Sequence, residues 1–162
     1  MPLVSAVSIN PLADGRQSAR ALRVRRGVQI LLREMGLATV PEMTLASGRR
    51  ADLVALAPDG GIVIVEIKSS PEDMMADAKW PGYRDYCDRL FFATLPDVPQ
   101  HLFPDDCGFI RADGHGAAIV ADAPEHRLAP ARRKAVTLRF ARFAAGRLLA
   151  AEWASGGQTA GP

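Results

Sequence analysis

Apolar positions recur along the chain with two different periods, which predict helices near both ends and strands between them. Residues 16–35 and 131–153 carry apolar side chains at helical spacing with arginines interspersed. The segments between them are short, apolar and rich in β-branched residues, which is typical of strands. We expect strands over residues 39–46, 51–57, 62–68, 89–95, 108–111 and 117–121. Another helix is predicted to begin at Ser70, because Pro71 and two acidic residues follow this cap residue, and to run towards Trp80.

The segment 52–68 has the pattern of a β-hairpin with charged side chains at its open end. Residues 58–60 read Pro-Asp-Gly, which fits a three-residue turn with a left-handed glycine. This turn places Asp52 opposite Glu66 on one face of the hairpin, with Lys68 projecting from the same face. A two-residue turn would instead put the two carboxylates on opposite faces.

These three charged residues are exceptions in a hairpin whose two faces are both otherwise apolar. Such strands are central ones, covered by helices on both sides. Charged groups near a core are paired, metal-bound or functional. Adjacent carboxylates repel each other, so a divalent cation is a natural partner. The alternative is an internal ion-pair trio in which Lys68 bridges Asp52 and Glu66.

The length of 162 residues and the 48% hydrophobic content indicate one folded domain that needs no disulfide or structural metal. We expect this domain over residues 16–153. Residues 1–15 and 154–162 contain glycine and proline without sustained periodicity, so we expect a loose N-terminal segment and a disordered tail.

The net charge of +2 conceals an uneven distribution of charge. Residues 1–50 carry +5, residues 51–126 carry −9 and residues 127–162 carry +6. Basic flanks favour a polyanionic partner, although 17 of the 20 basic residues are arginine, which codon bias alone can produce. With only Cys87 and Cys107, no secretory pattern and no apolar run long enough to span a bilayer, we expect a cytoplasmic protein without a membrane anchor.

Four segments resemble one family, the MmcB-like DNA repair family within the PD-(D/E)XK nuclease superfamily. They are residues 48–53, 65–70, 79–93 and 131–135. The resemblance implies a restriction-endonuclease-like α/β fold. Its αβββαβ core has a mixed central sheet flanked by helices, with an added C-terminal helix.

The resemblance also implies hydrolysis of phosphodiester bonds in structured or damaged DNA, with Mg²⁺ or Mn²⁺ as the cofactor. Asp52, Glu66 and the carbonyl of Ile67 would hold the metal, and Lys68 would position a water and stabilise charge on the phosphate. The expected partner is DNA, and a homodimer or a repair-protein partner is also compatible with the hypothesis.

The chain departs from the superfamily pattern at the first helix. Many members carry an acid there, whereas residues 24–27 read Val-Arg-Arg-Gly. Glu42 on the first strand is a candidate replacement ligand, although a solvated strand residue is the simpler interpretation. Glu34 is interpreted as a surface acid.

Four further residues are candidate DNA contacts. Lys79 and Tyr83 occupy the place where some relatives have Gln-x-x-x-Tyr, and Arg49 and Arg50 adjoin Asp52. Each has a structural alternative: Lys79 as a surface lysine, Tyr83 as a core aromatic, and the arginines as caps of the hairpin edge.

Two other functions stay open. A catalytically inactive DNA-binding or adaptor protein of nuclease fold would explain the missing helix acid. A structural α/β protein would use the hairpin charges only as an ion pair.

Overall fold

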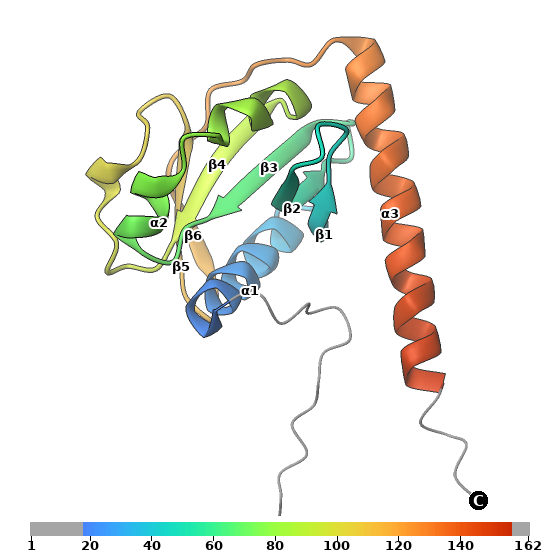
Figure 1. Ribbon diagram of the computed structural model, residues 1–162, viewed down its shortest axis with the longest axis horizontal. Helices are drawn as coiled ribbons and strands as arrows, with labels where there is room; N and C mark the ends of the chain where they lie inside the picture. Colours follow the sequence, from blue (N-terminus) through green and yellow to red (C-terminus); the bar gives the residue numbers. More distant parts are fainter. Residues whose placement is uncertain (1–17, 157–162) are drawn as a thin grey trace, which may run out of the picture.

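The computed structural model describes residues 18–156, which form a mixed six-stranded sheet with helices around it (Figure 1). The expected loose segment 1–15 and residues 157–162 of the expected tail lie outside the described residues. In chain order the elements are α1 (Ala19–Glu34), β1 (Ala38–Thr44), β2 (Arg50–Leu56), β3 (Ile62–Ile67), α2 (Pro71–Ala76), the 3₁₀ helix η1 (Trp80–Tyr86), β4 (Arg89–Thr94), the 3₁₀ helix η2 (Gln100–Leu102), β5 (Gly108–Ala112), β6 (Ala117–Ala121) and α3 (Pro130–Gly156).

The strands lie side by side in chain order, from β1 to β6. The β1–β2, β2–β3 and β5–β6 pairs are antiparallel, whereas β3, β4 and β5 run parallel to one another. This confirms the predicted α/β fold with a helix, three strands, a helix and a parallel fourth strand, followed by a C-terminal helix.

Local sequence signals set the helix boundaries. The Ser70 hydroxyl accepts a hydrogen bond from the Asp73 N–H at 3.2 Å, which caps α2 as predicted. The same helix ends at Ala76 rather than running on to Trp80, and Pro81 then lies in the first turn of η1. At the other end of the chain, α3 continues to Gly156, beyond the predicted end at residue 153.

The β2–β3 hairpin has the predicted register. Leu53 pairs with Val65 and Val54 with Ile64, and Gly60 takes the left-handed conformation with φ of 90°. The pairing depends on a turn of the predicted length, because a shorter one would reverse the faces of every side chain in β3. Asp52 and Glu66 therefore lie on the same face.

The two faces of the sheet carry separate apolar clusters. Helix α1 covers one face, where Val24, Val28 and Leu32 pack on residues such as Leu53 and Val65. The opposite face is covered by η1, part of α2 and the first half of α3. Its cluster contains Val54, Ile64, Tyr83, Phe92 and Val136, among others. Asp52 and Glu66 have the strand parity of Val54 and Ile64, so they belong to this second face.

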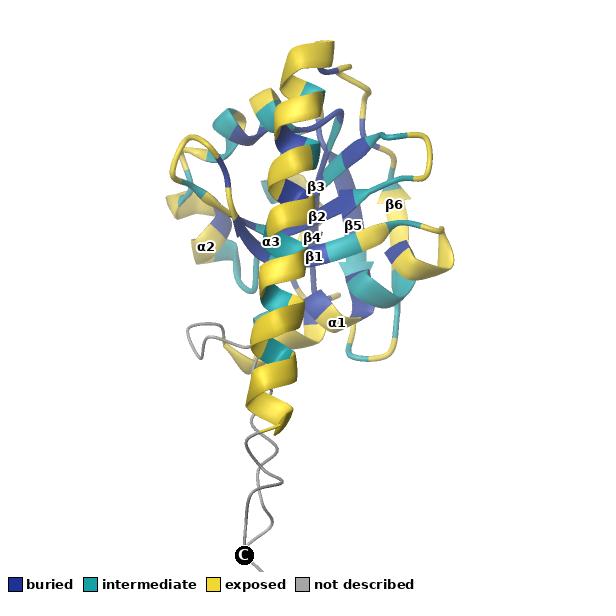
Figure 2. Ribbon diagram, turned by 90° about the vertical axis from the view of Figure 1, so that its right-hand side faces the viewer, coloured by how far each residue is buried: buried dark blue, intermediate teal, exposed yellow. Residues whose placement is uncertain are grey.

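Helix α3 is anchored mainly near its start. The Asp88 carboxylate accepts two hydrogen bonds from Arg133, both at 2.7 Å, and also accepts the backbone N–H groups of Ile62 and Leu128. Burial acts to raise the pKa of Asp88, but these hydrogen bonds outweigh it and lower that pKa to about 2. Beyond this point α3 runs past the edge strand β1 and projects from the domain, exposed on most of its surface (Figure 2). Within the described residues, no helix is long and apolar enough to cross a membrane.

Candidate active site

The site is built on two carboxylates that face each other at the open end of the β2–β3 hairpin. The Ile67 N–H donates to Asp52 Oδ2 at 2.8 Å, and the Asp52 N–H donates to Glu66 Oε1 at 3.1 Å. Each carboxylate is thus fixed by the backbone of the strand that carries the other. This reciprocal arrangement follows from the hairpin register, and it leaves one oxygen of each carboxylate outside these two bonds.

Burial makes ionisation of this pair unfavourable. Desolvation raises the pKa of Asp52, although the hydrogen bond from Ile67 and the charge of Lys68 act against it. Desolvation, followed by repulsion from Asp52, raises the pKa of Glu66 well above its ordinary value. A buried carboxylate in contact with a partly buried one therefore favours either a shared proton or a bound cation.

Lys68 lies beside this pair, but its ion pair is with a different residue. Its ammonium is 2.5 Å from a carboxylate oxygen of Asp77, which directly follows α2. Burial acts to raise the pKa of Asp77, and the hydrogen bond from Lys68 leads the interactions that outweigh it and lower that pKa. The bridging trio is therefore not the arrangement found, since Lys68 is anchored by Asp77 rather than strung between Asp52 and Glu66.

Tyr83 and the β1–β2 turn close one side of the site. The buried Tyr83 hydroxyl donates to the Arg50 carbonyl at 3.1 Å, and the Arg49 guanidinium donates to the Lys79 carbonyl at 2.9 Å. Burial raises the pKa of Tyr83, and the charges of Glu66 and Asp52 raise it further, which places the phenol near the carboxylates. Tyr83 is thus a packing and anchoring residue, as its structural alternative predicts.

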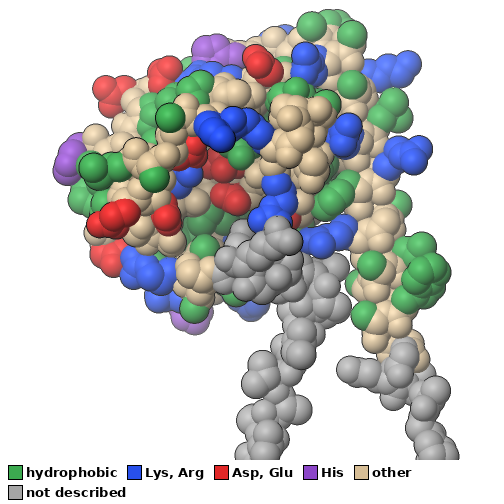
Figure 3. Space-filling model, in the orientation of Figure 1, with side chains coloured by type: hydrophobic (Ala, Val, Ile, Leu, Met, Phe, Trp, Pro, Cys, Tyr) green, Lys and Arg blue, Asp and Glu red, His purple; other side chains and the backbone are tan. Residues whose placement is uncertain are grey.

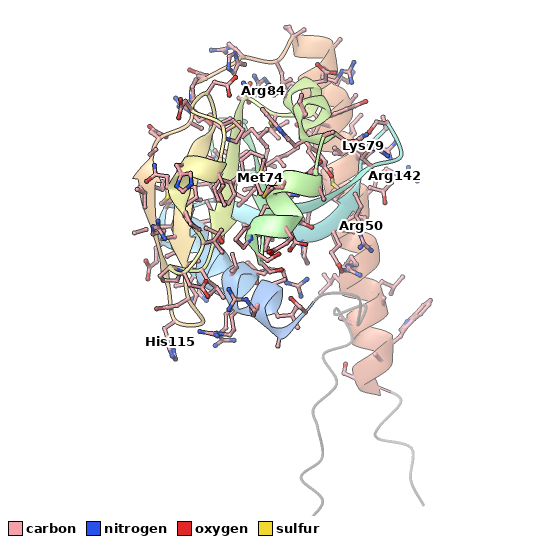
Figure 4. The ribbon with its side chains drawn as sticks, turned by 60° about the vertical axis from the view of Figure 1, so that its left-hand side comes forward. Arg50, Met74, Lys79, Arg84, His115 and Arg142 are labelled. Carbon is pink, nitrogen blue, oxygen red and sulfur yellow. The ribbon has the colours of Figure 1, made fainter. Side chains whose placement is uncertain are left out.

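The other three candidate DNA contacts lie nearer the surface. Arg50 and Lys79 are exposed, while Arg49 is partly buried. Figure 4 shows Arg50 and Lys79 on the side of the domain next to α3, far from His115 in the β5–β6 turn. The side chains of Arg50 and Lys79 are therefore accessible at the surface of the domain.

Glu42 is buried rather than solvated, which corrects the simpler interpretation of this residue. Its side chain is 4% exposed, and its carboxylate lies 3.7 to 3.9 Å from the guanidinium groups of Arg25, Arg50 and Arg147. Glu42 lies between the paired residues Pro41 and Met43, and its φ of 58° breaks the alternation of side chains along β1. The carboxylate of Glu42 therefore faces this group of arginines.

The first helix supplies no acid to the site. Arg25 is buried on α1 and faces Glu42. Within residues 18–156, no group of three or more His, Cys, Asp or Glu side chains is arranged to hold a metal ion. The site thus offers two carboxylates. It also offers the carbonyl oxygen of Ile67, which points towards β2, as the N–H of the same residue does. Such hard oxygen donors suit Mg²⁺, which keeps several waters and is commonly held by one or two carboxylates.

Sequence reasoning did not identify Asp77, Arg25 or Arg147 as parts of these charged groups. Asp77 was placed inside a helix that in fact ends before it, and this break turns its side chain towards Lys68. The arginines meet Glu42 only because α1 and α3 both approach the edge strand β1. The one local signal that could have identified Asp77 is its place directly after a short helix with a capping serine.

The fold and the site together define a class: an α/β protein with a mixed central sheet, a C-terminal helix and a paired-carboxylate site with a lysine on its central hairpin. Residues 8–155 match the profile of a family described as DNA repair protein MmcB-like. The chain therefore belongs to the MmcB-like DNA repair protein family, as its sequence motifs predict.

Two solved structures are similar to this chain to very different degrees. The SPO1766 protein of unknown function from Silicibacter pomeroyi is 44% identical, with a TM-score of 0.82, over 86% of this chain and 96% of that one. A repair endonuclease from Pyrococcus abyssi is 14% identical, with a TM-score of 0.33, over 56% of this chain and 43% of that one. No curated protein matches the sequence.

Proposed function

We propose that this protein is a metal-dependent DNA nuclease that hydrolyses phosphodiester bonds during repair. The observation that carries the proposal is the hairpin pair Asp52 and Glu66, each held by the other strand's backbone, with the charge of Lys68 nearby. Membership of a DNA repair family supports DNA as the substrate. Cys87 and Cys107 are free thiols, which suits a reducing compartment, so we place the reaction in the cytoplasm.

In this proposal Asp52, Glu66 and the Ile67 carbonyl hold Mg²⁺ or Mn²⁺. A bound metal of this kind lowers the pKa of its water and offsets charge on the phosphate. The protein's own contribution is to keep both carboxylates in place through strand backbone. Asp77 directs the Lys68 ammonium, whose charge can stabilise the phosphate as its negative charge grows.

The test uses branched, flapped and single-stranded DNA with Mg²⁺ or Mn²⁺. Asp52→Asn and Glu66→Gln should each reduce cleavage by at least a hundredfold, while Asp105→Asn, an exposed loop carboxylate, should cleave like the unmodified protein. Mn²⁺ without DNA should raise the melting temperature of the unmodified protein but not that of Asp52→Asn. Cleavage that survives Asp52→Asn would contradict the proposal.

The second candidate is a DNA-binding or adaptor protein that has lost turnover. It is favoured by the absence of a third acidic ligand among the described residues and by the place of Arg25 in α1. It predicts salt-sensitive DNA binding with no product from any of the substrates, and no metal-dependent rise in melting temperature.

A further inference from the structure

We infer that one face of α3, together with the β1–β2 turn, is a track for the backbone of duplex DNA that leads to the carboxylate pair. The track consists of Arg132, Arg139 and Arg142. This inference rests on the proposed function for its ligand, because DNA is the polyanion that a phosphodiester-cleaving site would need to hold. The two basic flanks of the sequence then have different roles, because the last helix binds DNA and the first does not.

The first two thirds of α3 carry only basic charges. Residues 130–147 carry six Lys or Arg side chains and no Asp or Glu. Two of these six are engaged by carboxylates, Arg133 by Asp88 and Arg147 by Glu42. Among the described residues, Arg132, Arg139 and Arg142 form no ion pair with a carboxylate.

Those three arginines are aligned on one side of the helix. They are separated by seven and three positions, which at 3.6 residues per turn keeps them on one face. All three are exposed. The guanidinium group of Arg132 lies over the Tyr86 ring at 4.7 Å, and that of Arg139 donates to the Thr44 carbonyl at 3.3 Å, so the protein itself orients both groups.

A groove follows this row of arginines where α3 passes the β1–β2 turn. One hollow of about 240 Å³ is lined by Arg132 and Arg139 with Leu45, Ala46 and Tyr86. It adjoins another of about 540 Å³, which shares Arg139 and adds Arg142. From Arg132 to Arg142 the helix rises about 15 Å, over which one strand of B-DNA presents roughly four phosphates.

The 3₁₀ helix η1 lies between the groove and the candidate active site. Tyr86 lines the groove, and Tyr83, one turn earlier, lies beside Asp52 and Glu66. In the space-filling view, acidic side chains occupy the middle of this face and basic side chains follow α3 next to them (Figure 3). Helix α1, by contrast, packs on the opposite face of the sheet. Its exposed residues Arg23, Arg26 and Arg33 line neither hollow.

The experiment compares two triple variants that remove the same charge. Arg132→Gln, Arg139→Gln and Arg142→Gln alter the track, and Arg23→Gln, Arg26→Gln and Arg33→Gln alter exposed positions on α1. Both are made in Asp52→Asn, and affinity for a labelled duplex is measured without metal across a range of salt concentrations. Binding is then read separately from cleavage.

The track variant should bind at least tenfold more weakly, and its slope of log K against log salt should be smaller by about 2 to 3, since each lost phosphate contact removes roughly 0.9. The α1 variant should keep both values close to those of Asp52→Asn alone. Equal losses in the two triple variants, or none in either, would overturn the track.

Thermal melts and the single variant Arg142→Gln keep this test interpretable if the triple variant folds poorly. Arg142 is exposed, so its replacement should leave the melting temperature unchanged and still reduce affinity. Failure of the track is distinguishable from failure of the nuclease proposal. Cleavage with equal binding in both triple variants rejects the track alone, whereas track-dependent binding without cleavage by unmodified protein rejects only the nuclease.

Discussion

At the scale of single residues, the groups that hold the two carboxylates in place differ from the group that offsets their negative charge. Asp52 and Glu66 are fixed by backbone donors, whose partial charges are too small to offset one buried and one partly buried carboxylate. Lys68 supplies a full charge nearby, yet its closest partner is Asp77. The function of Asp77 is therefore to set the position of the lysine relative to the carboxylates.

This arrangement predicts a specific effect of Asp77→Asn. The variant keeps the shape of the side chain but loses the charge that directs Lys68, so cleavage should fall roughly tenfold through kcat with little change in KM. Because the Lys68–Asp77 pair is largely buried, with 12% and 18% of the two side chains accessible, losing its charge should cost about 1 to 3 kcal/mol of stability.

Cleavage assays with Asp77→Asn, Asp77→Glu and the exposed control Asp85→Asn measure this effect. Asp77→Glu should restore part of the activity, because it returns a negative charge to the same place. An Asp77→Asn protein with unchanged kcat would show that Lys68 needs no such partner.

At the scale of elements, α1 lies very close to the β5–β6 turn at Gly27, where there is no room for a side chain. A Cβ added at Gly27 would lie 2.2 Å from the Asp113 carbonyl oxygen and 2.4 Å from that of Gly116. Both contacts are with backbone, which cannot move aside without displacing the turn. The close approach sets how α1 sits on its face of the sheet.

Gly27→Ala should therefore destabilise the protein by about 1 to 3 kcal/mol, the usual cost of overpacking. Gly146→Ala is the matched control within α3, where an added Cβ meets nothing within 4 Å, and it should be neutral or stabilising by about 0.5 to 1 kcal/mol. Urea unfolding curves compare the two variants. Equal stability of Gly27→Ala and Gly146→Ala would mean that α1 can shift freely on the sheet.

The elements also show which parts of this structure are predictable from sequence. The hairpin register was predictable because the three-residue turn is a local signal, and the pairing of Asp52 with Glu66 follows from it. The ion pairs of Glu42 and Lys68 were not, because they depend on where a helix ends and on a left-handed residue inside a strand. Local turn chemistry thus determines that the two carboxylates face each other, and long-range packing determines which charged residues surround them.

At the scale of the whole molecule, the carboxylate pair links folding stability to pH. The pKa of Glu66 is raised in the folded protein, chiefly by burial and then by Asp52, and that of Asp52 is raised as well. Between the unfolded pKa, near 4, and the higher folded pKa, the folded protein binds more protons than the unfolded chain. Metal-free protein should consequently lose stability as pH rises through this window, by up to about 1.4 kcal/mol per pH unit for each extra proton bound.

Glu66→Gln isolates this linkage, because the amide oxygen can still accept the Asp52 N–H while the charge is gone. In the presence of a chelator, the variant should be more stable than the unmodified protein at pH 8 and should lose less stability between pH 5 and pH 8. Added Mn²⁺ should stabilise the unmodified protein increasingly as pH rises, since the metal competes with protons for the same oxygens. Denaturant unfolding at several pH values, with and without Mn²⁺, measures the free energy of unfolding of both proteins. If this free energy changes with pH in parallel for the two proteins, Glu66 is not the group that couples folding to pH.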